Sequence, residues 1–207
     1  MTRLLLVRHG ETDWNLEHRF QGQSDIPLNE TGQQQAVALG KRLAGEEMDA
    51  IYASDLRRTW QTALQIVAQH DLEIIPEPRL REMSFGRWEG LTFRQMTEEE
   101  PRIIDGWGEF MNTVGPPEGE SIPVFAARLQ TALDVIAAAH PDQTVLLVTH
   151  GGVIMLLLCL FMEIPVERYW RFRVSQASIS VVDVFPEGAI INRINDTCHL
   201  DGMNDES

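Results

Sequence analysis

The chain has 207 residues, 43% of them hydrophobic and 23% charged, a balance typical of a globular domain large enough to bury a core. Acidic residues outnumber basic ones by 31 to 17, and the formal net charge of −14 argues against nucleic acid or an anionic membrane as a partner. The two cysteines are too few for a disulfide framework or a cysteine-rich metal site.

No segment of the sequence is typical of a targeting signal or a membrane span. The apolar run at the N-terminus is followed at once by Arg8 and His9, so it is too short for a signal peptide. The longest uninterrupted apolar run, residues 153–162, has half of the roughly 20 residues that a helical span needs. We therefore expect a cytoplasmic protein.

Short apolar runs alternate with segments of helical periodicity along the chain. Buried strands are predicted at residues 4–7, 50–53, 72–75 and 144–148. Helices are predicted at 29–44, from a cap at Ser54 through Val67, at 121–140 and at 152–161, with Asn29 and Ser121 as further caps. The irregular stretch 82–120 favours one helix near 92–100, and residues 178–185 and 189–194 predict a hairpin.

Strands that are apolar throughout and are separated by helices are typical of a parallel sheet covered on both faces. The sequence therefore predicts an α/β fold, a three-layer α/β/α sandwich with a mostly parallel central sheet and a C-terminal antiparallel hairpin. We expect one domain over residues 1–200 and a flexible acidic tail over 201–207.

Charged and polar side chains gather where the predicted strands end. Because ligands bind beyond the carboxyl ends of parallel strands, these residues are expected to meet at one edge of the sheet. The four exits read Arg8-His9-Gly10, Ser54-Asp55-Leu56-Arg57-Arg58, Leu80-Arg81-Glu82 and Thr149-His150-Gly151.

This mixture of side chains suits phosphoryl transfer. Arginine binds phosphate through two parallel hydrogen bonds and keeps its charge, and a helix starting at Gly151 or Gly152 directs backbone N–H groups at an anion. Neutral imidazole can attack phosphorus, and a protonated carboxyl can donate a proton to the leaving oxygen. A small phosphate ester is therefore the expected substrate class.

The same residues resemble the histidine phosphatase superfamily, the phosphoglycerate mutase-like proteins. The matching segments, in order, are Arg8–Thr12 with Asn15, Arg19–Leu28, Ser54–Arg58 with Thr62-Ala63, Leu80–Gly90, Pro117–Ser121 and Thr149–Gly151. Residues 170–178 also resemble the alpha-ribazole phosphatase and broad-specificity phosphatase branch. The resemblance covers residues 3 to about 200.

The resemblance implies a role for each matching position. His9 is the nucleophile that becomes phosphorylated, and Glu82 is the proton donor and later the base for water. Arg8, Arg58 and His150 complete the phosphate pocket. The residues expected to line it are Asn15, Gln21, Gly22 and Gly151, and no cofactor is implied.

Several positions leave a choice that the sequence weighs without settling. Spacing favours Arg58 over Arg57 as the phosphate ligand, and Glu89 is the rival of Glu82 as the acid. Asp55 stands where the family more often has proline or a small residue, so we expect it to point away or to pair with an arginine. Residues 105–114 fit a substrate lid and a packed loop equally well.

Other functions remain as alternatives. A cofactor-dependent phosphoglycerate mutase would use the same phosphohistidine, but mutases of this family carry a longer basic insert than residues 102–121 provide. A zinc site is disfavoured because arginines would repel the cation and no His-Glu-x-x-His spacing occurs. A phosphate sensor without catalysis is disfavoured because the whole reactive set is present. The resemblance also allows a homodimer, because members of the family are often dimers.

Overall fold

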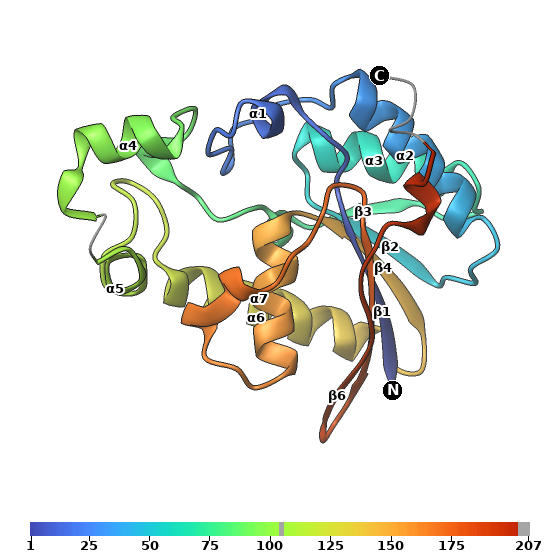
Figure 1. Ribbon diagram of the computed structural model, residues 1–207. Helices are drawn as coiled ribbons and strands as arrows, with labels where there is room; N and C mark the ends of the chain where they lie inside the picture. The colour runs from blue at the N-terminus through green and yellow to red at the C-terminus, as the bar shows by residue number, and fades with distance from the viewer. Residues whose placement is uncertain (104–105, 203–207) are drawn as a thin grey trace.

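The computed structural model describes residues 1–103 and 106–202. The predicted tail therefore lies outside the described residues from position 203 onward. Within the described ranges, six strands form one sheet in the order β3-β2-β4-β1-β5-β6 (Figure 1). Their bounds are β1 Thr2–Arg8, β2 Ala50–Ala53, β3 Ile74–Pro76, β4 Thr144–Thr149, β5 Ile179–Phe185 and β6 Gly188–Asp196.

The sheet is parallel from β3 to β1 and antiparallel at β5 and β6, as the sequence predicts. One boundary differs, because the third strand begins at Ile74 and not at Leu72. Leu72 lies before the strand, and its side chain packs against the part of the core that α2 and α3 cover.

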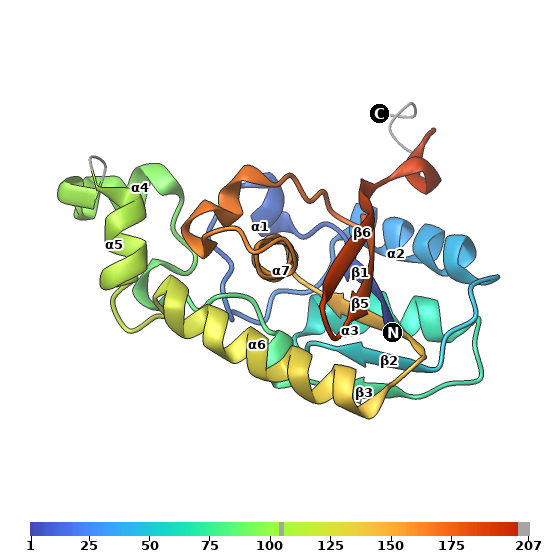
Figure 2. The same ribbon diagram turned by 90° about the horizontal axis from the view of Figure 1, so that it is seen from below.

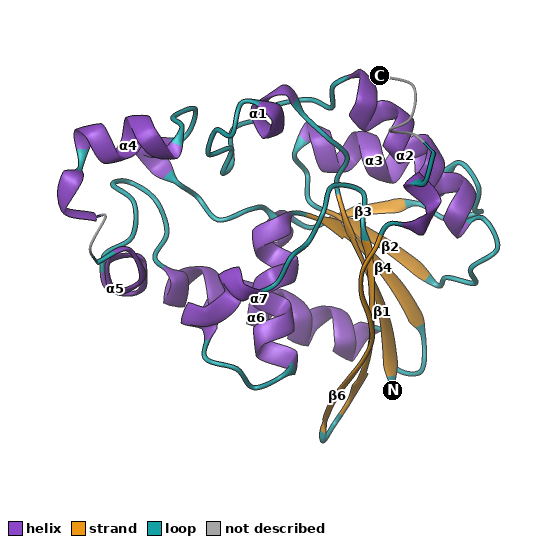
Figure 3. Cartoon of the chain, in the orientation of Figure 1, coloured by secondary structure: helices purple, strands orange, loops and turns teal. Residues whose placement is uncertain are grey.

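Helices cover both faces of the sheet (Figures 2 and 3). The long helices are α2 Glu30–Leu43, α3 Arg57–Val67, α6 Ile122–Ala139 and α7 Gly151–Phe161. Side chains of β1 alternate between the faces: Leu4 and Leu6 pack with α6 and α7, while Leu5 and Val7 pack with α2 and α3. The predicted three-layer sandwich is therefore confirmed.

The predicted helix caps have mixed outcomes. Asn29 caps α2, since its side chain accepts a hydrogen bond from the N–H of Gly32 at 2.8 Å. Ser121 precedes α6 but makes no capping bond through its side chain. Ser54 is not a cap, because α3 begins three residues later at Arg57 with Leu56 as its N-cap.

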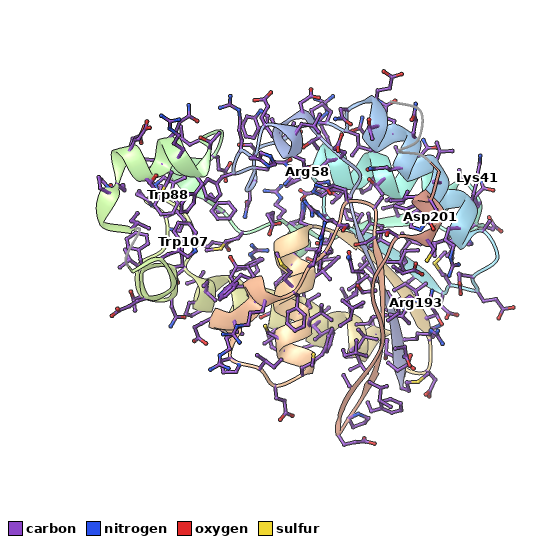
Figure 4. All side chains as sticks on the ribbon, viewed as in Figure 1. Lys41, Arg58, Trp88, Trp107, Arg193 and Asp201 are labelled. Carbon is purple, nitrogen blue, oxygen red and sulfur yellow. The ribbon has the colours of Figure 1, made fainter. Side chains whose placement is uncertain are left out.

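Residues 85–103 and 106–114 form a packed unit beside the sandwich. It contains α4 Phe93–Glu99, as predicted near 92–100, and α5 Trp107–Thr113, which the sequence did not reveal. Trp107 stacks on Trp88 with ring centroids 5.8 Å apart (Figure 4), and Met111 is buried. The described part of residues 105–114 is therefore a packed element, and most of it is helical where a packed loop was one of the two expectations.

Helix α6 is long and apolar enough to cross a membrane by length and composition alone. Core helices pass the same test, and one face of α6, which includes Phe125, Leu129 and Ile136, is buried in the core, while Val124 and Val135 on the other face are exposed. The helix also carries Arg128 and Asp134.

The short helix α1, Asp13–Leu16, follows β1 directly, and the sequence did not predict it. Thr12 and Asn15 close its first turn by hydrogen bonding to each other's backbone, with the Thr12 N–H 3.1 Å from the Asn15 side-chain oxygen. This turn fixes the segment that leaves the sheet after His9.

Candidate active site

Three strand exits meet at the carboxyl end of the sheet. The N–H of His9 donates to the carbonyl of Thr149 at 2.9 Å, and the N–H of Ser54 donates to the carbonyl of Val148 at 3.0 Å. These bonds continue the pairing of β1 and β2 with β4 by one residue each. The rings of His9 and His150 meet edge to face, with centroids 5.2 Å apart.

His9 is held as a neutral imidazole with one free nitrogen. Its Nδ1 lies 2.6 Å from the carbonyl oxygen of Gly10, and because a carbonyl only accepts, Nδ1 carries the proton. Burial lowers the pKa of His9 well below its usual value, and the charges of Arg58 and Arg8 lower it further. The lone pair of Nε2 is therefore available as a nucleophile.

The backbone after His9 has no room for a side chain. A Cβ on Gly10 would lie 2.4 Å from the carbonyl oxygen of Gly32. The N–H of Gly10 also donates to the buried hydroxyl of Thr62 at 3.2 Å. Close packing against α2 and α3 thus sets the carbonyl that orients His9.

Arg8 comes from the end of β1 and lies beside the start of α7. Its Nη1 donates to the carbonyl of Val174 at 2.6 Å, and a Cβ on Gly151 would lie 3.2 Å from its Cζ. Its Nε is buried and lacks a hydrogen-bond partner among the described residues. An N–H left unbonded at a buried site is a donor ready for an anionic ligand.

Arg58 lies in the first turn of α3 and is fully buried (Figure 4). Nη1 and Nη2 donate to the carbonyls of Ser24 and Gly22, both at 2.7 Å, and Nε donates to Nδ1 of His150 at 3.3 Å. Burial lowers the pKa of Arg58 to about 10, so it stays charged near neutrality. Two further guanidinium N–H groups remain for a ligand.

His150 links Arg58 to Ser54. Because Arg58 donates to Nδ1, Nε2 carries the proton and donates to the Ser54 hydroxyl at 2.9 Å. Burial lowers the pKa of His150 well below its usual value, and the nearby Arg58 adds to the effect. The ring is therefore neutral. Ser54 is a hydrogen-bond partner of this ring and does not cap α3.

Glu82 reaches the start of α7. Its Oε2 accepts the N–H of Gly152 at 2.9 Å, and its Oε1 accepts the N–H of Met83 at 3.0 Å. The electrostatic influence of its carboxylate extends to both Arg8 and Arg58. The anion at this helix N-terminus is thus the protein's own acid, positioned beside the two arginines.

Glu89, the rival acid, has a different environment. Its Oε1 accepts the N–H of Gln23 at 2.9 Å and of Phe85 at 3.2 Å, while Oε2 accepts the hydroxyl of Ser24 at 2.5 Å. A Cβ on Gly22 would collide with this carboxyl. Glu89 therefore holds the loop that carries the carbonyl partners of Arg58.

The remaining arginines near the strand exits are ion-paired or exposed. Arg57 is exposed, which agrees with the preference for Arg58. Arg81 donates to both carboxylate oxygens of Asp55 and lowers the pKa of Asp55, so the unusual acid pairs with an arginine as expected. Arg79 pairs in the same way with Glu77.

The expected lining residues divide into two groups. Gly22 and Gly151 contact Arg58 and Arg8, as described above. Gln21 is buried, and its Oε1 has no hydrogen-bond partner in the described part of the chain. The side-chain oxygen of Asn15 is used in the turn of α1, so nothing in its contacts ties it to the arginines.

No three His, Cys, Asp or Glu side chains gather as a metal site within residues 1–103 and 106–202. The charges that act on His9 are instead those of the Arg58 and Arg8 guanidinium groups, and the carboxylate of Glu82 acts on both arginines. Such a set can bind a phosphate dianion, present a neutral imidazole to phosphorus and deliver a proton to a leaving oxygen.

Comparison with known proteins agrees with this chemistry. The family model described as histidine phosphatase superfamily (branch 1) matches residues 4–197. Phosphoserine phosphatase 1 of Hydrogenobacter thermophilus is 35% identical over 97% of this chain and 95% of its own. A Yersinia enterocolitica protein named "Probable phosphoglycerate mutase GpmB" is 36% identical over 97% and 96%. The alpha-ribazole phosphatase structure from Shigella flexneri has a TM-score of 0.86, 30% identity, and coverage of 94% and 96%.

Proposed function

Because this chain belongs to the histidine phosphatase superfamily and is a phosphatase of small phosphorylated substrates, we propose that it hydrolyses alkyl phosphomonoesters without a metal ion, through a phosphohistidine on His9. The observation that carries the proposal is the bond from Nδ1 of His9 to the Gly10 carbonyl, which leaves Nε2 unprotonated. The lowered pKa of His9 keeps the ring neutral in this position.

In the first step, Nε2 of His9 attacks phosphorus and the bond from phosphorus to the ester oxygen breaks. Glu82 gives its proton to that oxygen, so an alcohol leaves. The charges of Arg8 and Arg58 stabilise the transferring group. The first step uses the protonated form of Glu82.

In the second step, water attacks the phosphorus of the phosphohistidine. The carboxylate of Glu82 takes a proton from the water, the bond from phosphorus to Nε2 breaks, and inorganic phosphate leaves. His9 and protonated Glu82 are regenerated. His150 contributes by orienting Arg58 through its Nδ1 and by facing His9.

Phosphoserine is the first substrate to test, because its alcohol is a poor leaving group and a relative is named for it. The assay measures phosphate release from phosphoserine, other alkyl phosphates and p-nitrophenyl phosphate, each with and without a chelator. We expect activity that chelation leaves unchanged and that His9→Ala abolishes. Loss of activity with the chelator contradicts the metal-independent mechanism.

The mutase alternative has its own support in the relative named for that activity. Conversion of 3- to 2-phosphoglycerate that depends on 2,3-bisphosphoglycerate, together with little phosphate release, would favour it. Net hydrolysis in the same assay favours the phosphatase. Both reactions need the phosphohistidine, so His9→Ala abolishes either.

Location and assembly stay predictions. A cytoplasmic protein is consistent with two free cysteines, one buried and one exposed. Cell fractionation tests the location. Sedimentation tests whether the chain forms the homodimer that the family resemblance allows.

A further inference from the structure

Arg128 joins helix α6 to the segment that carries Glu82. Its Nε and Nη2 donate to the two carboxylate oxygens of Glu120 at 2.8 and 2.6 Å. Its Nη1 donates to the carbonyls of Arg79 and Arg81 at 2.7 and 2.9 Å, and Nη2 also donates to the carbonyl of Glu82 at 3.2 Å. One guanidinium thus binds three backbone carbonyls, and the last of the three belongs to Glu82 itself.

Glu120 holds the same segment from its other end. Its Oε2 accepts the N–H of Ser84 at 2.8 Å, and its own N–H donates to the Ser84 carbonyl at 2.9 Å. The side chains of Arg128 and Glu120 are only 19% and 15% exposed, which shields the pair from solvent. The backbone of residues 79–84 is therefore bound on both sides of Glu82.

This bracing matters because the Glu82 carboxyl has few contacts of its own. Its oxygens bond to two backbone N–H groups, Met83 and Gly152, and its carbonyl takes one more bond, from Nε2 of Gln23 at 3.2 Å. The position of the carboxyl therefore depends on the backbone of its own segment, which Arg128 and Glu120 bind, as well as on the first turn of α7. Proton transfer needs hydrogen-bond reach, so a small displacement of this backbone is costly.

We propose that Arg128, together with Glu120, is a positioning residue that fixes the backbone of residues 79–84 and so places the proton donor Glu82 against the leaving oxygen. Arg128 acts through Glu82 and does not contact the substrate. The inference rests on the proposed role of Glu82. Arginine is required because its planar fork spans Glu120 and three carbonyls, which the single ammonium group of lysine cannot.

The test uses how kcat/KM depends on the leaving group. This parameter reports only the steps through phosphohistidine formation, so hydrolysis of the intermediate does not enter. 2,4-Dinitrophenyl phosphate has a good leaving group that needs little protonation, while phosphoserine needs a donor. The variants are Arg128→Lys, which keeps the charge, and Glu120→Gln, which keeps the shape. Glu82→Gln is the reference.

The matched controls are Arg87→Lys and Glu118→Gln. These residues form an ion pair that also involves the loop before α6, with Nε of Arg87 2.8 Å from the Glu118 carboxylate. The pair is exposed, and Arg87 makes none of the carbonyl contacts of Arg128. The controls therefore separate bracing of Glu82 from loss of an ion pair in general.

For Arg128→Lys and Glu120→Gln we expect kcat/KM with phosphoserine to fall about 10- to 100-fold, part of what a general acid contributes. The fall with 2,4-dinitrophenyl phosphate should be less than about threefold, and the controls should match wild type. In the Glu82→Gln background Arg128→Lys should have little further effect, because both act on one proton transfer.

An equal fall with both substrates would overturn the proposal, since a merely structural role predicts it. So would an undiminished effect of Arg128→Lys in the Glu82→Gln background. If Arg128→Lys does not fold, the Glu120→Gln ratio decides alone. The decisive quantity is the ratio of kcat/KM with phosphoserine to kcat/KM with 2,4-dinitrophenyl phosphate. If Glu82→Gln leaves this ratio unchanged, the role of Glu82 is contradicted. If Glu82→Gln changes the ratio but Arg128→Lys and Glu120→Gln do not, only the bracing is contradicted.

Discussion

The N–H of Gly152 lies 2.9 Å from Oε2 of Glu82, so the first turn of α7 holds the proposed proton donor. A Cβ at position 152 would lie 2.3 Å from Oε1 of the same carboxyl. Gly152→Ala must therefore displace Glu82. We expect kcat/KM with phosphoserine to fall at least about tenfold with little change in melting temperature, because a flexible side chain moves and not the backbone.

Gly108→Ala is the control for this variant. Gly108 is also the second residue of a helix, α5, and a Cβ there meets no atom within 4 Å. We expect its activity to equal that of wild type. Equal activities of Gly152→Ala and Gly108→Ala would show that the space beside Gly152 does not control Glu82.

Arg58 and Arg57 are adjacent in α3 but differ in burial, which makes them a matched pair. Arg58→Lys removes the fork that bonds to Ser24, Gly22 and His150, so we expect kcat/KM to fall about 100-fold or more. Arg57→Lys should stay within about threefold of wild type, because Arg57 is exposed. A larger loss of kcat/KM in Arg57→Lys than in Arg58→Lys would show that Arg57, and not Arg58, binds the phosphate.

The folded protein should lose stability in mild acid because His9 and His150 are buried as neutral rings. Their pKa values are lowered on folding, so below about pH 6.5 the unfolded chain binds more protons than the folded one. Their contribution is fully present above that pH. Below it, the free energy of unfolding should drop by up to about 1.4 kcal/mol per pH unit for each histidine.

Urea unfolding between pH 7.5 and 5 measures this slope. His9→Asn and His150→Asn should each reduce it, since each removes one group that takes up a proton on unfolding. His18→Asn, at an exposed histidine, should leave it unchanged. A slope that the two buried variants share with wild type would contradict the neutral state of these rings.

The sequence alone predicts the sheet and which strand ends come together, because both depend on local patterns. Apolar runs mark β1 and β4, and the motif residues follow them directly, so His9 and His150 could be placed at one edge. Asn29 could be identified as a cap because capping involves residues three positions apart.

Contacts between distant segments could not be predicted in this way. Ser54 has the residue type of a cap, but its partner is His150, 96 positions away. Arg128 resembles a solvent-facing residue of an amphipathic helix, and only folding brings it to the carbonyls of residues 79–82. Its partner Glu120 lay in a matched motif whose role the sequence did not reveal.

Gly86 tests the close contact between the segment of Glu82 and residues 116–120. It has a φ of +51°, and a Cβ there would lie 2.1 Å from the carbonyl oxygen of Pro117. Gly86→Ala is therefore expected to lower the free energy of unfolding by at least about 1 kcal/mol. Thermal melts of the two variants measure this. Gly45→Ala is the control, because a Cβ there meets no atom within 4 Å, and it should not destabilise the protein.

The central claim is that phosphate passes through Nε2 of His9, and rapid quenching followed by mass spectrometry of the peptides tests it most directly. Mixing with p-nitrophenyl phosphate and quenching in alkali, which preserves phosphohistidine, should yield a peptide phosphorylated on His9. The phosphate should be on Nε2, because Nδ1 is bonded to the Gly10 carbonyl. We expect neither phosphopeptide nor turnover from His9→Ala. Turnover by that variant, or phosphate on a different residue, would contradict the account.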